Sequence, residues 1–209
     1  EYTFKHALTH EVAYGSLLLE RRRVLHARLV EALEALVPER VAEQVDLRIV
    51  AATGLYTYND VPFYFHYRGV IFDTDPDPMV GMFVKDITEG IADTGVKAGI
   101  IKCATDQDGL TPGVERVLRA CARTHRETGV PITTHTDAGT FRGRDQQRVF
   151  EEEGVDLTRV VIGHSGDSTD LDYLRELMDN GSMIGMDRFG VDVLLPFDEQ
   201  RVAIRGHER

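Results

Sequence analysis

The chain has 209 residues, a formal net charge of −11 and a sequence pI of about 5.2. That charge argues against nucleic acid or an anionic membrane surface as a partner. Two cysteines are too few for a disulfide framework, and every apolar run is shorter than the ~20 residues of a membrane helix. We therefore expect a protein of a reducing, cytoplasmic compartment with no membrane partner.

Residues 1–46 are predicted to form a helical segment. Four leucines recur at helical spacing within this stretch, and Ala, Leu, Glu and Arg dominate it. The composition changes near Asp46, after which apolar, strand-like runs alternate with amphipathic stretches. We expect two parts, the helical segment and an α/β domain over residues 47–209 with a parallel sheet and covering helices.

Five strands and three helices are predicted in the second part. The strands are expected at roughly 47–53, 97–103, 130–135, 159–164 and 182–187, and the helices at 112–128, 143–153 and 171–179. Pro112 suits the first turn of the first helix, and Gly129 is placed to end it. Residues 55–80 carry many aromatic residues and Asp-Pro turns, and are predicted to be a long, partly structured loop over the edge of the sheet.

Three polar residues stand near the ends of successive strand-like runs. Lys102, His135 and His164 are separated by roughly the length of one strand–helix–strand unit. In a parallel α/β sheet this places all three side chains at the edge where such folds hold their active sites. Two imidazoles and a lysine at that edge predict a metal site, because neutral imidazole is a suitable zinc or manganese ligand. The simpler interpretation is that each histidine is a hydrogen-bonded residue at the start of a loop.

Lys102 has three interpretations beside two ligand histidines. It could form a salt bridge to an aspartate, act as a Schiff-base lysine, or carry a carboxylated amine that bridges two metals. The residues alone do not choose among them. Cys103 alternates with Lys102 along the strand, so we expect it to face the helices and pack as a small hydrophobic residue.

The motifs that carry these residues resemble the phosphotriesterase family, most closely its lactonase-like branch. They are Gly99-Ile-Ile-Lys-Cys-Ala-Thr105, Pro131-Ile-Thr-Thr-His-Thr136, Val161-Ile-Gly-His-Ser165, Gly185-Met-Asp-Arg-Phe-Gly190 and Ala52-Thr-Gly-Leu-Tyr-Thr-Tyr-Asn-Asp-Val-Pro-Phe-Tyr64. The resemblance covers about residues 48–200. It implies part of a (β/α)8 barrel, about strands three to six, which belongs to a two-metal hydrolase.

The resemblance also implies roles for individual residues. Lys102 would be the carboxylated lysine that bridges the metals, and His135 and His164 would hold the more exposed metal, zinc or otherwise manganese, cobalt or iron. Tyr56 would lie near the bridging hydroxide, and Arg188 near the substrate pocket. The substrate would be a small-molecule ester, either a lactone or an organophosphate.

Two family features are missing. The family has a His-x-His pair on its first barrel strand and a metal-binding Asp on its last, whereas this chain has no His-x-His pair and ends soon after Arg188. Residues 1–45 resemble instead a helical segment of bacterial adenylate-cyclase-like and regulatory ATPase proteins. We therefore expect an incomplete, weakly active or inactive hydrolase that associates, as a homodimer for example, through the open side of its barrel. The alternative is a non-catalytic helical interaction module with a barrel remnant.

Overall fold

The computed structural model describes residues 50–72, 77–188, 196 and 199. The predicted helical segment, residues 1–46, lies outside this part of the chain. Within it, five parallel strands form one sheet in the order β1-β2-β3-β4-β5. The strands are β1 (Ala52–Gly54), β2 (Ile100–Thr105), β3 (Ile132–Thr136), β4 (Val160–Ile162) and β5 (Met183–Ile184).

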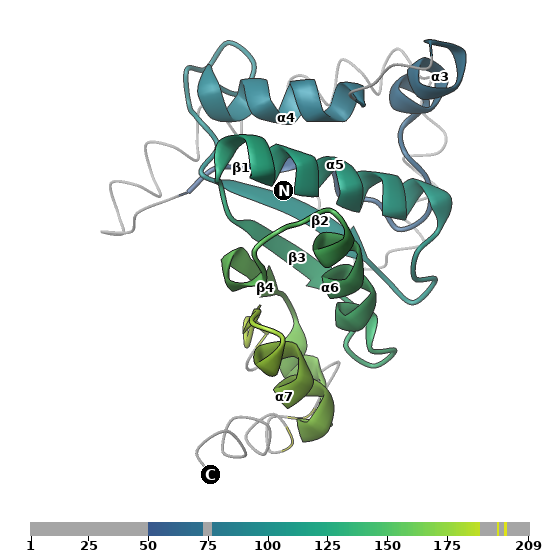
Figure 1. Ribbon diagram of the computed structural model, residues 1–209, viewed down its shortest axis with the longest axis vertical. Helices are drawn as coiled ribbons and strands as arrows, with labels where there is room; N and C mark the ends of the chain where they lie inside the picture. Colours follow the sequence, from purple (N-terminus) through teal and green to yellow (C-terminus); the bar gives the residue numbers. More distant parts are fainter. Residues whose placement is uncertain (1–49, 73–76, 189–195, 197–198, 200–209) are drawn as a thin grey trace, which may run out of the picture. The chain divides into compact units, whose positions relative to one another are not determined.

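Helices alternate with these strands along the chain. They are α3 (Phe63–Phe72), α4 (Pro78–Thr88), α5 (Pro112–Thr128), α6 (Arg142–Glu152) and α7 (Leu171–Asp179), with 3-10 turns η1 (Leu157–Arg159) and η2 (Ser165–Asp167). Figure 1 shows α4 to α7 side by side on one face of the sheet, in chain order. Parallel strands in sequential order with helices on one face are the arrangement of a partial (β/α)8 barrel, which confirms the predicted fold class.

The helix α5 follows the prediction from Pro112 to Thr128. Thr111 caps its start by accepting a hydrogen bond from the backbone N–H of Val114, and Gly129 ends it with a φ of 72°. Its buried stripe includes Cys121, which lies in the same core as Cys103 of β2. Both thiols are fully buried, so the prediction that Cys103 packs against the helix layer is confirmed.

The described residues between 55 and 80 contain more helix than predicted. The structure has the ten-residue helix α3 here, and α4 begins at Pro78. Asp77 caps α4 by accepting from the backbone N–H of Met79, and Pro78 occupies the first turn. Met79, Val80 and Phe83 then bury one face of the helix. The Asp-Pro pair that suggested a turn is therefore the start of a helix.

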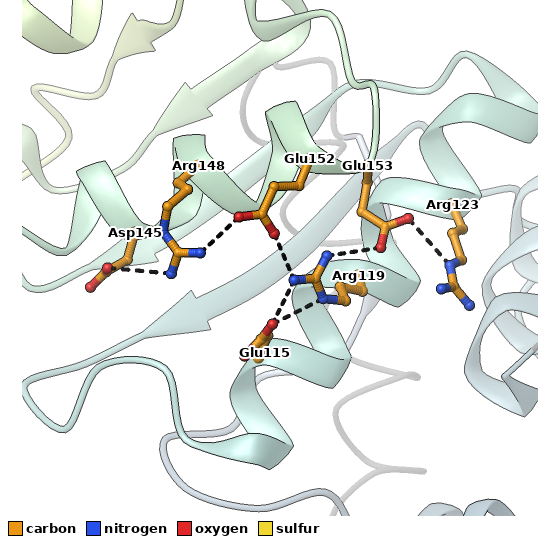
Figure 2. Close-up of polar contacts among 7 residues, drawn as sticks. All are labelled: Glu115, Arg119, Arg123, Asp145, Arg148, Glu152 and Glu153. Carbon is orange, nitrogen blue, oxygen red and sulfur yellow. Dashed lines mark hydrogen bonds and ion pairs between the residues drawn. The ribbon is translucent and has the colours of Figure 1, made fainter.

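The helices α5 and α6 are joined by a network of ion pairs on their outer surface (Figure 2). Arg119 of α5 contacts Glu115 of its own helix at 2.6 Å. It also contacts two residues at the end of α6, Glu152 at 2.7 Å and Glu153 at 3.0 Å. Arg123 also contacts Glu153, at 3.3 Å. Arg119 is thus the centre of the network, because it is bonded to three carboxylates from two segments of the chain.

Candidate active site at the carboxyl edge of the sheet

The strand register places Lys102 and His135 on the same face of the sheet. Lys102 is opposite Thr133, and Ala104 is opposite His135. Residues two apart on a strand share a face, so Lys102 and His135 lie on neighbouring strands and on one face, two residues apart along the strand direction. Lys102 is partly buried, and burial lowers the pKa of its amine, opposed by the nearby charges of Cys103 and Asp187.

His164 lies beside His135 at the end of the next strand. The centroids of the two imidazole rings are 4.6 Å apart, and the ring planes are inclined at 78°. His164 follows β4 in a left-handed conformation, with a φ of 59°. Gly163 allows this approach, because a Cβ atom there would lie 2.0 Å from the backbone oxygen of Thr134 on β3. The structure therefore brings the two predicted histidines together.

Asp187 holds His164 in place. Its Oδ1 atom accepts a hydrogen bond from the backbone N–H of His164 at 3.0 Å and lies 2.8 Å from the Nδ1 atom of the ring. A carboxylate can only accept in this contact, so Nδ1 carries the proton and the lone pair of a neutral ring lies on Nε2. A carboxylate that accepts from one ring nitrogen fixes the orientation of the ring and can direct the other nitrogen toward a metal.

His135 has a different neighbour, the guanidinium of Arg188. The Nη2 atom of Arg188 lies 3.4 Å from His135 Nδ1, and its Nη1 atom donates to Asp167 Oδ2 at 2.8 Å. His135 is only 9% exposed. Burial, followed by the charges of His164 and Arg188, lowers the pKa of His135 to about 4. The ring is therefore neutral near pH 7, which is the form that binds a metal.

Tyr56 and Tyr58 cover His135 from the segment that follows β1. Their ring centroids lie 5.1 and 5.7 Å from that of His135, and their hydroxyl oxygens are 2.8 Å apart. Burial and the hydrogen bond to Tyr58 raise the pKa of Tyr56, so its hydroxyl keeps its proton at neutral pH. The predicted residue Tyr56 therefore lies at the site as a hydrogen-bonding group next to an imidazole.

A cavity of about 380 Å³ opens beside His135 and Arg188. Its wall comes from the end of β3, from the segments after β2, β3 and β4, and from Arg188. The lining residues are Asp106, Gln107, His135, Thr136, Asp137, Ala138, Gly139, Asp167 and Arg188. The sequence interpretation assigned no site role to the carboxylates of Asp106, Asp167 and Asp187. Their position in the sequence could have identified them as site residues, since Asp106 and Asp167 follow β2 and β4, and Asp187 follows β5.

The metal-ligand set is small. Among the described residues, no group of three or more His, Cys, Asp and Glu side chains is arranged to hold a metal ion. His135 and His164 could supply two nitrogen donors. A protonated lysine has no lone pair, so Lys102 could join them only as a free amine or in a carboxylated form.

Comparison with known proteins places this chain in a family. Residues 23–207 match the phosphotriesterase family. The chain belongs to this family. A "phosphotriesterase homology protein" of Mycobacterium tuberculosis is 66% identical over 174 residues, which cover 80% of this chain and 53% of that protein. The "aryldialkylphosphatase" of Saccharolobus solfataricus is 44% identical over 162 residues, covering 78% of this chain and 50% of that protein.

Solved structures of the phosphotriesterase family agree. The structure of the phosphotriesterase from Mycobacterium tuberculosis superposes with a TM-score of 0.75 at 65% identity, over 80% of this chain and 54% of that one. A mutant of a phosphotriesterase-like lactonase from Deinococcus radiodurans gives a TM-score of 0.72 at 37% identity, over 80% and 53%. The chain thus spans about half the length of the relatives it matches.

The family match corrects one expectation about the start of the chain. It begins at residue 23, well before residue 48, where the recognised motifs begin. Residues 23–45 therefore fall inside the phosphotriesterase match, and the comparisons do not support the resemblance of residues 1–45 to adenylate-cyclase-like and regulatory ATPase proteins. Separately, no helix in the described ranges is long and apolar enough to cross a membrane.

Proposed function

We propose that this chain carries the metal-binding edge of a phosphotriesterase-family hydrolase that acts on lactones or organophosphate esters. The observation that carries the proposal is the His135–His164 pair, with ring centroids 4.6 Å apart on the edge of a parallel sheet that also bears Lys102. The substrate classes are those named for the relatives, an aryldialkylphosphatase and a lactonase.

The residues present fit one divalent ion. His135 is neutral at pH 7, and Asp187 fixes His164 so that its Nε2 lone pair is available. Burial lowers the pKa of Lys102, which increases the fraction of free amine, and the free amine is the form that carbon dioxide carboxylates. Because the sequence contains no His-x-His pair, we expect at most one bound zinc, manganese, cobalt or iron ion per chain.

The protein groups around the cavity bind and orient an ester. A divalent ion held by His135 and His164 would lower the pKa of a water molecule bound to it and would polarise the carbonyl or phosphoryl oxygen under attack. The protonated hydroxyl of Tyr56 is a hydrogen-bond donor near His135, and the wall that includes Asp106 and Asp137 accepts hydrogen bonds. The cavity volume of about 380 Å³ suits a small-molecule ester.

The proposal is tested by metal content and hydrolysis together. The purified chain would be dialysed against zinc or manganese with bicarbonate, its bound metal measured by mass spectrometry, and hydrolysis of a γ-lactone and an aryl dialkyl phosphate followed. We expect up to one ion per chain, lost in His135→Ala and His164→Ala and kept in His66→Ala, an exposed histidine on α3.

Hydrolysis should be weak, because this chain would hold one ion where the family's two-metal site holds two. Losing several kcal/mol of charge stabilisation lowers the reaction rate by on the order of a thousandfold. Ions that bind equally well to the His135→Ala variant would contradict the proposed site. A chain with no metal and no hydrolysis under any of these conditions would favour the non-catalytic alternative.

A further inference from the structure

The hydrogen bond between Arg188 and His135 fixes where the imidazole carries its proton. A guanidinium has five N–H donors and no acceptor, so Arg188 Nη2 donates in the 3.4 Å contact with His135 Nδ1. Nδ1 must therefore provide the lone pair. A neutral imidazole has one such nitrogen, so the proton of His135 lies on Nε2.

A bond from His135 to a metal needs the same lone pair. If the metal binds Nδ1, it takes the nitrogen that Arg188 contacts. If the metal binds Nε2, the proton must move to Nδ1, where it faces the N–H groups of the guanidinium, donor against donor. In either case the Arg188 contact and a His135–metal bond exclude each other.

Arg188 is held in this position by Asp167. The Nη1–Oδ2 contact is 2.8 Å, and the side chains of Arg188 and Asp167 are 25% and 14% exposed. One planar guanidinium thus reaches a carboxylate with one nitrogen and an imidazole with the other. The two histidines of the pair differ as a result, because Asp187 leaves the Nε2 lone pair of His164 available, whereas Arg188 uses the lone pair of His135.

We propose that Arg188, held by Asp167, is a positioning residue that competes with the metal ion for His135 and so weakens metal binding at this site. The proposal rests on the proposed function, because it requires that His135 is a metal ligand. Metal binding then includes the release of Arg188 from His135. Arg188 and Asp167 already line the cavity beside His135, so a guanidinium released from His135 but still bonded to Asp167 would stay at its wall.

The affinity for Mn²⁺ and for Zn²⁺ tests whether Arg188 weakens metal binding through its contact with His135 or through its positive charge. It would be measured by equilibrium dialysis at fixed pH on the full chain and on Arg188→Met, Arg188→Lys and, as a control, Arg175→Met, which removes an exposed arginine on α7. We expect Arg188→Met to bind roughly three- to tenfold more tightly, about the equilibrium factor of one hydrogen bond. Arg188→Lys keeps the charge but lacks the planar fork, so it should also bind more tightly, though less so.

Proton-detected ¹⁵N spectra of the imidazoles give a readout that does not depend on metal. Without added metal, His135 should show a protonated Nε2 and an unprotonated Nδ1, and Arg188→Met should shift this ring toward a tautomer mixture while His164 keeps its proton on Nδ1. A structural role for Arg188 alone would lower the melting temperature without changing the tautomer.

Three outcomes contradict the inference. Affinities in Arg188→Met within twofold of the original chain, with binding still dependent on His135, overturn it and leave the proposed function standing. Tighter binding in Arg188→Met with an unchanged His135 tautomer shows repulsion between charges in place of competition for a lone pair. No His135-dependent binding in any variant contradicts the proposed function, and the inference with it.

Discussion

Gly163 lies where the site allows no side chain. A Cβ atom at this position would be 2.0 Å from the backbone oxygen of Thr134, which belongs to the neighbouring strand. Gly163→Ala therefore has to push β3 and the segment before His164 apart. We expect a loss of about 2–4 kcal/mol of stability, and a melting temperature lower by roughly 5–15 °C for a domain of this size.

Gly139→Ala is the matched control for this prediction. Its Cβ atom would meet only Asp137 Oδ1, at 3.6 Å, which is an ordinary van der Waals contact. The two variants would be compared by thermal unfolding followed by circular dichroism. Equal melting temperatures for both would show that the chain around His164 can move apart at little cost.

Asp187 should matter for metal binding through its contacts with His164. Asp187→Ala removes the acceptor for the backbone N–H and for the Nδ1–H of His164. Loss of such a partner typically lowers metal affinity 10- to 100-fold. Equilibrium dialysis tests this, with Asp172→Ala on the exposed surface of α7 as the control. Unchanged affinity in Asp187→Ala would mean that His164 is oriented by other groups or is not a ligand.

At the scale of single elements, α4 offers a substitution that should stabilise the protein. Gly81 lies inside this helix, is exposed, and has open space at its Cβ position. Alanine is about 0.5–1 kcal/mol more favourable than glycine in a helix interior. We expect Gly81→Ala to raise the free energy of unfolding by that amount, measured by urea denaturation with an unchanged slope. A lower stability would show that this glycine has a contact outside the described residues.

The ion pairs of Arg119 should raise the free energy of unfolding. Arg119 is 29% exposed and contacts three carboxylates, and isolated surface pairs contribute about 0.2–1 kcal/mol each, so we expect Arg119→Met to cost roughly 1–2 kcal/mol (Figure 2). Arg175→Met, which removes a single exposed pair, should cost much less. Urea denaturation at low and high salt measures both, and the difference should shrink with added salt.

The pH dependence of this network follows from Glu152. The hydrogen bonds from Arg119 and then Arg148 lower its pKa. A carboxyl with a lower pKa in the folded state stabilises the protein above its ordinary unfolded pKa, and this stabilisation is lost as pH falls through the folded value. The original chain should therefore lose more stability than Arg119→Met between pH 5 and 3. Parallel acid unfolding curves would indicate that Glu152 is not coupled to Arg119.

The helices differ in how far the sequence determined them. The helix α5 was predictable because Pro112, a long amphipathic pattern and Gly129 all agree with its bounds. The helix α4 was not predicted, since Asp77-Pro78 is equally typical of a turn and of a capped helix start. Its burial depends on packing against α5, a tertiary contact that periodicity in a short segment does not show.

The residues of the site also differ in how far the sequence determined them. The closeness of His135 and His164 was predictable, because the ends of neighbouring parallel strands lie at one edge of the sheet. The pairing of Arg188 with Asp167 and His135 was not, because it joins residues 21 and 53 positions apart through side-chain geometry alone. The contact between Asp187 and His164 likewise spans 23 positions. Strand order predicts which residues share an edge, but not which of them form hydrogen bonds.

At the scale of the whole molecule, the sheet formed by the described residues has two edges. β1 and β5 each pair with one strand, whereas a closed barrel has no edge. Unpaired backbone groups on an edge strand are a template for pairing with another chain, and an exposed apolar residue adds to this tendency. Met183 on β5 is such a residue, 53% exposed. We propose that the chain associates with a second copy through this open side of its sheet.

The association should depend on the protein concentration and on Met183. Light scattering from about 1 to 100 µM should show a rise above the 23.4 kDa of the single chain. Met183→Lys should reduce it, because a lysine on an edge strand opposes strand pairing. Met82→Lys on α4, where the methionine is 37% exposed, is the control away from the edge. A 23.4 kDa species at every concentration, with a cooperative melt that Met183→Lys leaves unchanged, would show that this edge is closed within one chain.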